Sequence, residues 1–327
     1  MSKTIIDNSV RDLLKDKNSV LRRRLTLNNL KTALWVVIRF VLLLGLCFII
    51  LYPFIVKFSS VFMSVADTYD DTVSLIPRNP TLDNIKYLFE ETELLPAMSN
   101  TFIVSIIVAV LSVISSSLIG YGLAKFRFRG KNLVFILVVL TLVIPMSSIS
   151  IPMFIHYRYF DVLSIFKVLI GHPVNLIDTY FPNAILAATS LGFRGGLYVI
   201  MMRQCFIGIP YELNEAASVD GAGTFRTFYQ VNLPLAKGMA FVVFLLSFCW
   251  QWTDVAYATR LMTTVELLPS VLNSIRNALS TSLGVGAYVN SLLANAFTLI
   301  AILPLIILYL IFQRQLIQGV ERSGIVE

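Results

Sequence analysis

Residues 211–235 read YELNEAASVDGAGTFRTFYQVNLPL and form a polar stretch between two long apolar runs of this 327-residue chain. Pro210, just before the stretch, suits the first turn of a helix, where its missing N–H costs nothing. The residues that follow contain no helix breaker until Gly221, which can adopt the left-handed backbone conformation that often ends a helix. The sequence therefore predicts a short, water-exposed helix that stops at a glycine elbow.

A second short helix is expected to follow the elbow. Thr224 can cap it through a side-chain hydrogen bond, and Phe225 and Phe228 fall on one helical face. Pro234 should force Leu233 out of the helical region and end this helix. The stretch is thus predicted to hold two short helices joined by glycine.

The composition of the whole chain is that of a membrane protein. Hydrophobic residues make up 57% of the chain and charged residues 14%, and the mean hydropathy is +0.78. A bilayer core needs about 20 apolar residues in a helix. Six runs approach that length, near residues 33–58, 99–122, 132–154, 182–205, 239–259 and 291–313. We expect an all-α, polytopic membrane protein with six transmembrane helices.

These runs divide the chain into an N-terminal arm (1–32), a transmembrane domain (33–313) that includes the polar loop 210–236, and a C-terminal tail (314–327). The first run is too long for a cleaved signal peptide, so it is expected to be retained. Basic residues near span ends stay on the cytoplasmic side. They cluster before the first span at Arg11, Lys15, Lys17, Arg22, Arg23, Arg24 and Lys31, whereas the next loop is acidic. Both termini and the polar loop are therefore expected to be cytoplasmic.

Ionisable and polar residues inside the spans are candidates for a translocation path, because such groups usually face the protein interior or a water-filled cavity. Arg194 lies in ATSLGFRGGLYV between glycines, so its helix should be broken beside a charge that reaches a cavity. The alternative to a path role is that Arg194 makes a structural hydrogen bond to a backbone carbonyl that the break leaves free. The other candidates are Trp250, Trp252, Asp254, Asn290 and Asn295. For Asp254 a place at the membrane interface is the alternative, and for Asn295 a hydrogen bond between helices.

Other functional classes lack support in the sequence. Cys47, Cys205 and Cys249 show no metal-ligand spacing and are interpreted as packing residues. The chain contains no G-x-x-x-x-G-K-[ST] motif for ATP. The net charge of +7 fits cytoplasmic loops and lipid head groups rather than nucleic acid. We expect a non-catalytic chain without a metal or cofactor.

The polar stretch carries a specific pattern. Glu215-Ala216-Ala217, three residues, Gly221, nine residues and Val231-Asn232-Leu233-Pro234 match E-A-A-x3-G-x9-I-x-L-P, with valine for isoleucine. This resembles the signature of ABC importer permeases. The resemblance implies that the stretch is a coupling element that docks on a separate ATPase. It assigns ATPase coupling to Glu215, Ala216, Ala217, Gly221, Leu233 and Pro234.

Further segments resemble the carbohydrate class of these permeases, the six-span subunit like the shorter maltose-transport permease. They are NPTLDNIKYLF, YGLAKFRFRGK, IPMF, QWTD and FQRQLIQGV. The resemblance implies the type I importer fold, alternating access and a bacterial cell-membrane location. It also implies a second homologous permease, two ATP-binding cassette subunits and an extracytoplasmic solute-binding protein as partners, beside the lipid bilayer.

Two departures from the family pattern leave the solute open. The external segment 156–181 is longer than usual, and QWTD replaces the commoner N-W-N-D. A carbohydrate, and in particular an oligosaccharide, is the expected solute. The alternatives are an ion-coupled secondary transporter, which can also use glycine-broken helices, and an ABC permease for a non-sugar or anionic solute.

Overall fold

The structure is a computed structural model that describes residues 3–70, 72–73, 75–162, 164–192, 194–281 and 285–324. Throughout the described residues the regular elements are helices, and the extended backbone makes one isolated antiparallel bridge, between Phe160 and Val174. The expected all-α class is therefore confirmed. The chain divides into two compact units, residues 1–60 and 61–327.

The first unit consists of a single helix, α1 (Lys3–Val61), which runs one residue beyond it. From Lys31 to Val61 this helix is long and apolar enough to cross a membrane, and no residue of its most apolar window is buried. A helix that is apolar on all sides belongs in a bilayer. The boundary expected at residue 32 falls inside this continuous helix.

The second unit begins with short helices and the first long one: α2 (Val65–Tyr69), α3 (Asp83–Glu91), α4 (Leu94–Lys125), α5 (Lys131–Val143), α6 (Met146–Arg158) and α7 (Ile165–Ile170). It continues with α8 (Phe181–Ala188), α9 (Gly195–Ile207), α10 (Glu212–Val219), α11 (Thr224–Thr227), the π-helical turn Phe228–Asn232 and α12 (Leu233–Leu235). The last helices are α13 (Lys237–Trp252), α14 (Ala258–Leu261), α15 (Leu268–Thr281) and α16 (Val285–Gly324).

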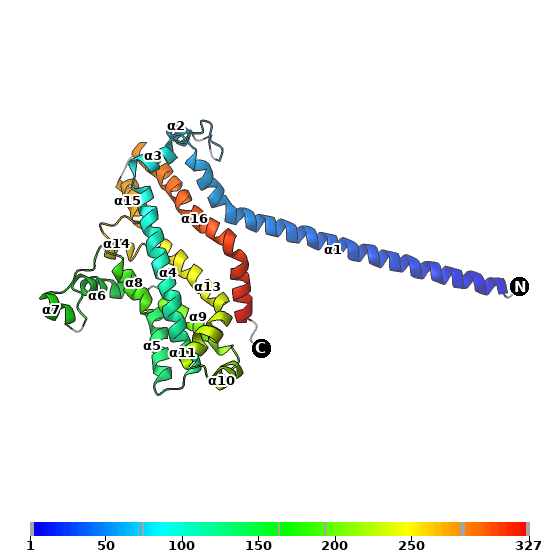
Figure 1. Cartoon of the computed structure of the whole chain (residues 1–327). Coiled ribbons are helices and arrows are strands. Elements are labelled where there is room, and N and C mark those ends of the chain that lie inside the picture. Colours follow the sequence, from blue (N-terminus) through cyan, green and yellow to red (C-terminus); the bar gives the residue numbers. More distant parts are fainter. Residues whose placement is uncertain are drawn as a thin grey trace. The chain divides into compact units, whose positions relative to one another are not determined.

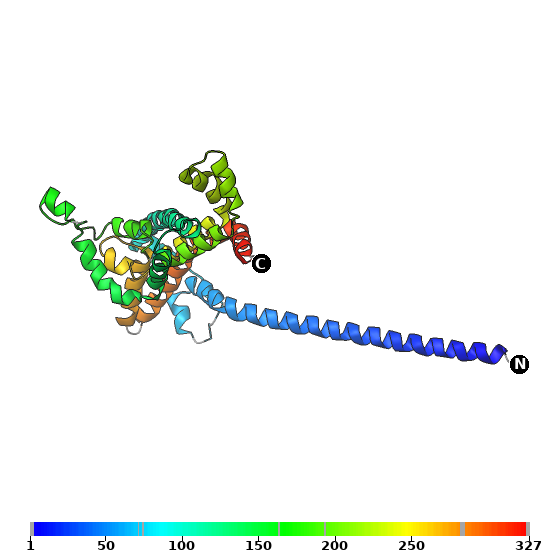
Figure 2. The same ribbon diagram turned by 90° about the horizontal axis from the view of Figure 1, so that it is seen from below.

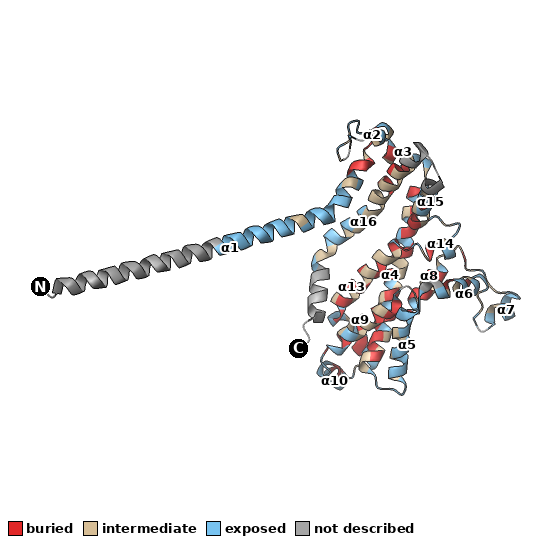
Figure 3. Cartoon of the chain, turned by 180° about the vertical axis from the view of Figure 1, so that it is seen from behind, coloured by how far each residue is buried: buried red, intermediate tan, exposed pale blue. Residues whose placement is uncertain are grey.

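The core of this unit forms where α4, α9 and α13 pack side by side (Figure 1). Buried residues gather along these three helices, whereas α5 and α7 are largely exposed (Figure 3). Small residues let the helices approach closely. A Cβ on Gly120 of α4 would lie 2.8 Å from the backbone nitrogen of Arg203, and Ser247 of α13 donates a hydrogen bond to Ser112 of α4 at 3.2 Å.

All six predicted apolar runs lie on helices, but three of them are bent or broken. Among the described residues three helices are individually long and apolar enough to span a membrane, or up to five if each bent pair counts as one. The run expected at 132–154 bends by 104° between Lys131–Val143 and Ser148–Arg158, and α13 meets the preceding helical segment at 76°. Pro145 explains the first bend, because proline disfavours a helical conformation of the residue before it. The C-terminal tail expected from residue 314 continues α16 as far as Gly324.

The segment 156–181, which the sequence analysis expects to be external, is tied to the bundle. Its ends are joined by the bridge between Phe160 and Val174, and α7 lies between them. Asp178 accepts hydrogen bonds from the backbone N–H groups of Thr263 and Thr264, so the loop is fastened beside α14. Burial acts to raise the pKa of Asp178, but these N–H groups and the two threonine side chains together hold its pKa below the ordinary value.

Candidate functional site

The first candidate site is the predicted polar elbow, which the structure places at one end of the bundle (Figure 1). Seen from below, this yellow-green segment stands clear of the packed helices (Figure 2). Helix α10 ends as expected: Gly221 has a φ of +77°, and the Ala222 N–H donates to the carbonyl of Ala217 at 2.9 Å. The second helix begins one residue earlier than predicted, and the expected side-chain cap from Thr224 is not made. Gly223 is extended at the N-cap position, and Thr224 is already helical.

The predicted helix end before Pro234 is wrong. Leu233 has helical dihedral angles of −64° and −43°, and the chain passes through a π-helical turn into α12. Pro234 stands in the first turn of α12, where its missing N–H leaves no intrahelical bond unmade. The Leu233 N–H donates instead to the carbonyl of Phe228, five residues back. The wider turn therefore carries the helical path through the proline.

Two buried asparagines fasten the halves of the elbow together. The Asn232 amide donates to the side-chain oxygen of Asn214 at 2.7 Å and to the carbonyl of Thr227 at 3.2 Å. Both asparagines are less than a tenth exposed. Lys125, at the end of α4, donates to the carbonyl of Ile209 at 2.6 Å. The elbow is thus a braced unit joined to α4, and not a free hinge.

The elbow exposes large apolar side chains beside its charged ones. Val219 is 87% exposed, Phe225 73% and Tyr229 63%. Phe228, by contrast, points inwards, with its ring centroid 4.9 Å from that of Tyr121 of α4. Of the predicted coupling residues, Glu215, Ala216, Gly221 and Pro234 are exposed, Leu233 is half-buried and Ala217 is buried. The elbow therefore combines a buried attachment to the bundle with an uncovered apolar surface.

The second candidate site lies where the predicted break around Arg194 occurs. Helix α8 ends at Ala188 and α9 begins at Gly195, and Arg194 between them has a φ of +63°. Glycine is required after it, because a Cβ on Gly195 would lie 2.2 Å from the carbonyl oxygen of Ser190. The guanidinium carbon of Arg194 lies 3.7 Å from the ring centroid of Trp250. This is a close cation–π stack.

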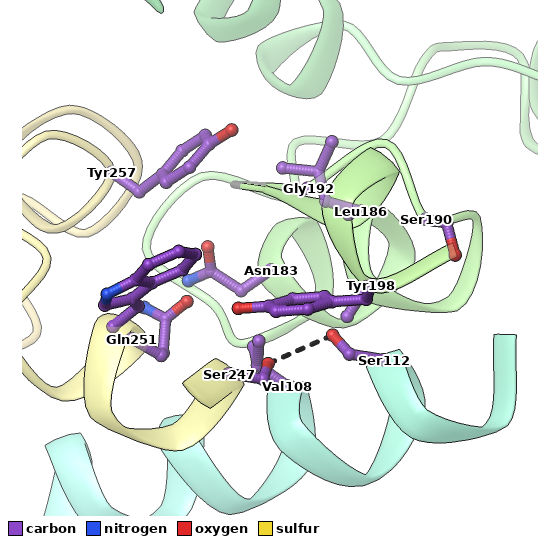
Figure 4. Close-up of a pocket in the computed structure, with 13 residues that line it drawn as sticks. Val108, Ser112, Asn183, Leu186, Ser190, Gly192, Tyr198, Ser247, Gln251 and Tyr257 are labelled. Atoms are coloured by element: carbon purple, nitrogen blue, oxygen red, sulfur yellow. Dashed lines mark hydrogen bonds between the residues drawn. The ribbon is translucent and has the colours of Figure 1, made fainter. Parts of the chain in front are cut away.

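Two neighbouring cavities adjoin this break. The first has room for only about 20 Å³, roughly one water molecule, between Asn183, Ser190, Tyr198 and Gln251 (Figure 4). The second has a volume of about 400 Å³ and is lined in part by Arg194. That volume is in the range of small-molecule binding pockets. The two cavities share Gly192 and Tyr257.

The structure brings Arg194 and Trp250 together and places the other four path candidates elsewhere. Trp252 is 3% exposed in the core, and its indole N–H donates to the carbonyl of Ala301. Asp254 is buried and accepts from the backbone N–H groups of Ala256 and Tyr257, which holds the chain leading into α14. Asn290 and Asn295 lie half-buried on α16 and line neither cavity.

Sequence reasoning missed several residues of both sites. Asn214 lies one residue before the motif, Asn232 occupies an unspecified position inside it, and Lys125 lies in the quoted segment YGLAKFRFRGK without a predicted bond. Asn183 and Gln251 are polar residues within apolar runs, which is a usable signal for a cavity. Gln251 also stands in the QWTD segment beside Trp250.

The chain is a helical membrane protein with a braced elbow that exposes apolar side chains. A family model described as the binding-protein-dependent transport system inner membrane component matches residues 116–322. The match covers more than half of the chain, and the chain belongs to this family. The predicted resemblance to ABC importer permeases is confirmed.

Relatives match over most of their length. The chain is 30% identical to the maltodextrin transport system permease protein MdxG of Bacillus subtilis, over 85% of this chain and 92% of that protein. It is 28% identical to the arabinooligosaccharides transport system permease protein AraQ of Halalkalibacterium halodurans, over 86% and 92%. It is 26% identical to the sn-glycerol-3-phosphate transport system permease protein UgpE of Yersinia pestis, over 84% and 92%.

Solved structures share the fold. A crystal structure of a bacterial ABC transporter involved in the import of the acidic polysaccharide alginate contains a chain with a TM-score of 0.68 and 24% identity, over 86% of this chain and 96% of that chain. A crystal structure of the bacterial alginate ABC transporter in complex with an alginate pentasaccharide-bound periplasmic protein gives a TM-score of 0.60 at 17% identity, over 86% and 95%.

Proposed function

We propose that this chain is one of two permease subunits of an ATP-driven importer and that its solute is a carbohydrate. The observation that carries the proposal is the elbow, in which the E-A-A-x3-G-x9-V-x-L-P motif folds into a braced unit with an exposed apolar face. Exposed apolar patches of this kind mark protein–protein contacts. MdxG and AraQ are named for sugar transport, and this supports a sugar as the solute.

The elbow transmits force because it is stiff and attached at several points. An ATPase subunit docked on Val219, Phe225 and Tyr229 moves the elbow as a body. The Lys125 bond to Ile209 passes the movement to α4, and the continuous path through the π-helical turn passes it to α12 and onward to α13. The bundle then tilts, and the cavity beside Arg194 becomes open to one side of the membrane or the other.

The partners and orientation follow from the same proposal. The elbow and both chain ends face the cytoplasm, where two ATP-binding cassette subunits supply the hydrolysis. A second, homologous permease completes the path, and an extracytoplasmic binding protein delivers the solute. The basic corner before α5 agrees with this orientation, because Arg127 and Arg129 are exposed beside the elbow end of α4.

Reconstitution tests the proposal. The tagged chain should purify with a second permease and an ATPase, and proteoliposomes of this complex should accumulate a sugar only with ATP and the binding protein. Glu215→Lys and Gly221→Pro should abolish uptake while membrane insertion persists. Glu91→Lys makes the same charge change on the exposed end of α3 and should leave uptake unchanged. Uptake by the chain alone, driven by an ion gradient, would replace the proposal with a secondary transporter.

A further inference from the structure

We propose that the small cavity between Asn183, Tyr198 and Gln251 binds one hydroxyl group of the transported solute, and that the Gln251 amide selects for that hydroxyl. This inference rests on the proposed transport function and narrows its solute to one that carries a hydroxyl group at a particular position. The larger neighbouring cavity, of about 400 Å³, holds the rest of the solute.

The size of the small cavity limits what can enter it. Its volume of about 20 Å³ admits a group the size of one water molecule. A hydroxyl group has this size, whereas a sugar ring, a carboxylate or a phosphate is larger. Because the two cavities share Gly192 and Tyr257 in their walls, a solute in the larger one lies next to the smaller one.

The walls of the small cavity are neutral and can both donate and accept hydrogen bonds. Among the described residues that line it, none carries a charge. Asn183 of α8 and Gln251 of α13 each supply an amide, which has an NH₂ donor and a carbonyl acceptor. A hydroxyl group also donates and accepts, so it matches these amides. An ion in the same place lacks a counter-charge.

The two amides have few partners of their own. In the part of the chain that the structure describes, Gln251 forms hydrogen bonds through its backbone alone, and its carbonyl accepts from the Asp254 N–H at 3.3 Å. The Asn183 NH₂ contacts the Met262 sulfur, a weak acceptor, at 3.7 Å. Both side chains point into the same space as the Tyr198 ring (Figure 4).

A polar side chain within a membrane-spanning bundle is costly unless it forms hydrogen bonds or faces a path for solute or water. Gln251 lies in the run expected to span the membrane at 239–259 and begins the QWTD segment, one of the two departures from the family pattern. With no hydrogen bond to stabilise the fold, its amide is available to a solute hydroxyl. An ordered water molecule that bridges the amides is the other occupant of this size, and the two occupants predict different effects of substitution.

The test measures sugar binding to the complete purified complex, with the solute-binding protein left out so that its selectivity does not intervene. The probes are maltotriose and arabinotriose, titrated by calorimetry, followed by the monodeoxy derivatives of the trisaccharide that binds more tightly. We expect one derivative to bind about fivefold or more weakly than its parent, the scale of one neutral hydrogen bond. That derivative identifies the hydroxyl group that enters the small cavity.

Variants decide whether Gln251 is responsible. Gln251→Leu should weaken binding of the parent by about fivefold and make the parent and that derivative bind equally, because leucine has a similar size but no hydrogen-bonding group. It should not lower the thermal unfolding temperature, since no hydrogen bond within the protein is lost. Gln204→Leu is the matched control, because Gln204 is an exposed glutamine of α9 that lines neither cavity. It should keep the discrimination.

Three results would overturn this inference. They are a native complex that binds neither trisaccharide, a discrimination that survives Gln251→Leu, and a Gln251→Leu complex that fails to assemble. A surviving discrimination with a lowered unfolding temperature would indicate a structural water molecule instead.

The proposed function is tested separately. ATP-dependent uptake of a sugar would still support it after any of these results. Conversely, a complex that discriminates between hydroxyl groups through Gln251 but takes up sugar without ATP would remove the proposed function and leave the binding site.

Discussion

Replacing Asn232 by leucine should loosen the elbow more than replacing Asn214, and replacing both should restore much of the loss. Asn232 is fully buried, and its amide donates to Asn214 at 2.7 Å and to the Thr227 carbonyl at 3.2 Å. Asn232→Leu removes both bonds and leaves the buried Asn214 oxygen without this donor. An unsatisfied buried polar group costs about 1–3 kcal/mol.

The other single variant has a smaller effect. In Asn214→Leu the Asn232 amide keeps its bond to Thr227, so one hydrogen bond is lost, which costs about 1 kcal/mol. In the double variant both polar partners are replaced by apolar groups of similar size, a change that can be nearly neutral. The two substitutions should therefore be strongly non-additive, with a coupling of about 1–2 kcal/mol.

Hydrogen exchange of residues 210–235 in the purified complex measures the loss of local stability in each variant. Each 1.4 kcal/mol of local stability corresponds to about a tenfold change in the hydrogen-exchange protection factor. The control is Asn84→Leu, which removes another buried asparagine, bonded to the carbonyls of Val61 and Met63. It should leave protection of the elbow unchanged. Additive losses in the double variant, or native protection in Asn232→Leu, would refute the role given to this pair.

The remaining predictions concern other parts of the molecule. Gly221→Ala should lower the local stability of the elbow, measured by hydrogen exchange, by about 1–2 kcal/mol. A Cβ at this position meets open space, so the cost comes from the positive φ of the backbone alone. Gly221→Asn should cost less, and equal losses in the two variants would contradict this explanation. Phe225→Asp should weaken binding of the proposed ATPase partner by about tenfold or more in a pull-down titration, since burial of one phenylalanine contributes about 1.5–3 kcal/mol. Tyr159→Asp, at an exposed position just after α6, should leave that binding unchanged. Asp178→Asn should lower the thermal unfolding temperature at neutral pH. The pKa of Asp178 is lower in the folded protein, so its stabilisation is complete above the ordinary value of 3.8 and is lost as the pH falls through the folded pKa. The unfolding temperatures of the variant and the native protein should therefore become equal in acid. A constant difference between them at all pH values would disprove the assignment.

The sequence predicted the helical class, the six apolar runs, the glycine stop of α10 and the break beside Arg194. Each of these depends on local chemistry: apolar run length against bilayer thickness, the backbone freedom of Gly221, and glycines around a charge. It also contained the motif of the elbow, because the motif is a spacing of residues along the chain. The structure confirms the helical class, the glycine stop and the break beside Arg194, but it bends or breaks three of the six runs.

Only the tertiary structure decided how the sites are assembled. The Asn232 bond to Asn214 joins residues 18 apart, and the Lys125 bond to Ile209 joins residues 84 apart, so neither is visible in a local pattern. The sequence placed Trp252 and Trp250 in one group, but the first packs in the core and the second stacks on Arg194. Neighbours along a helix point in different directions, and which of them meets a cavity depends on the helices packed around it.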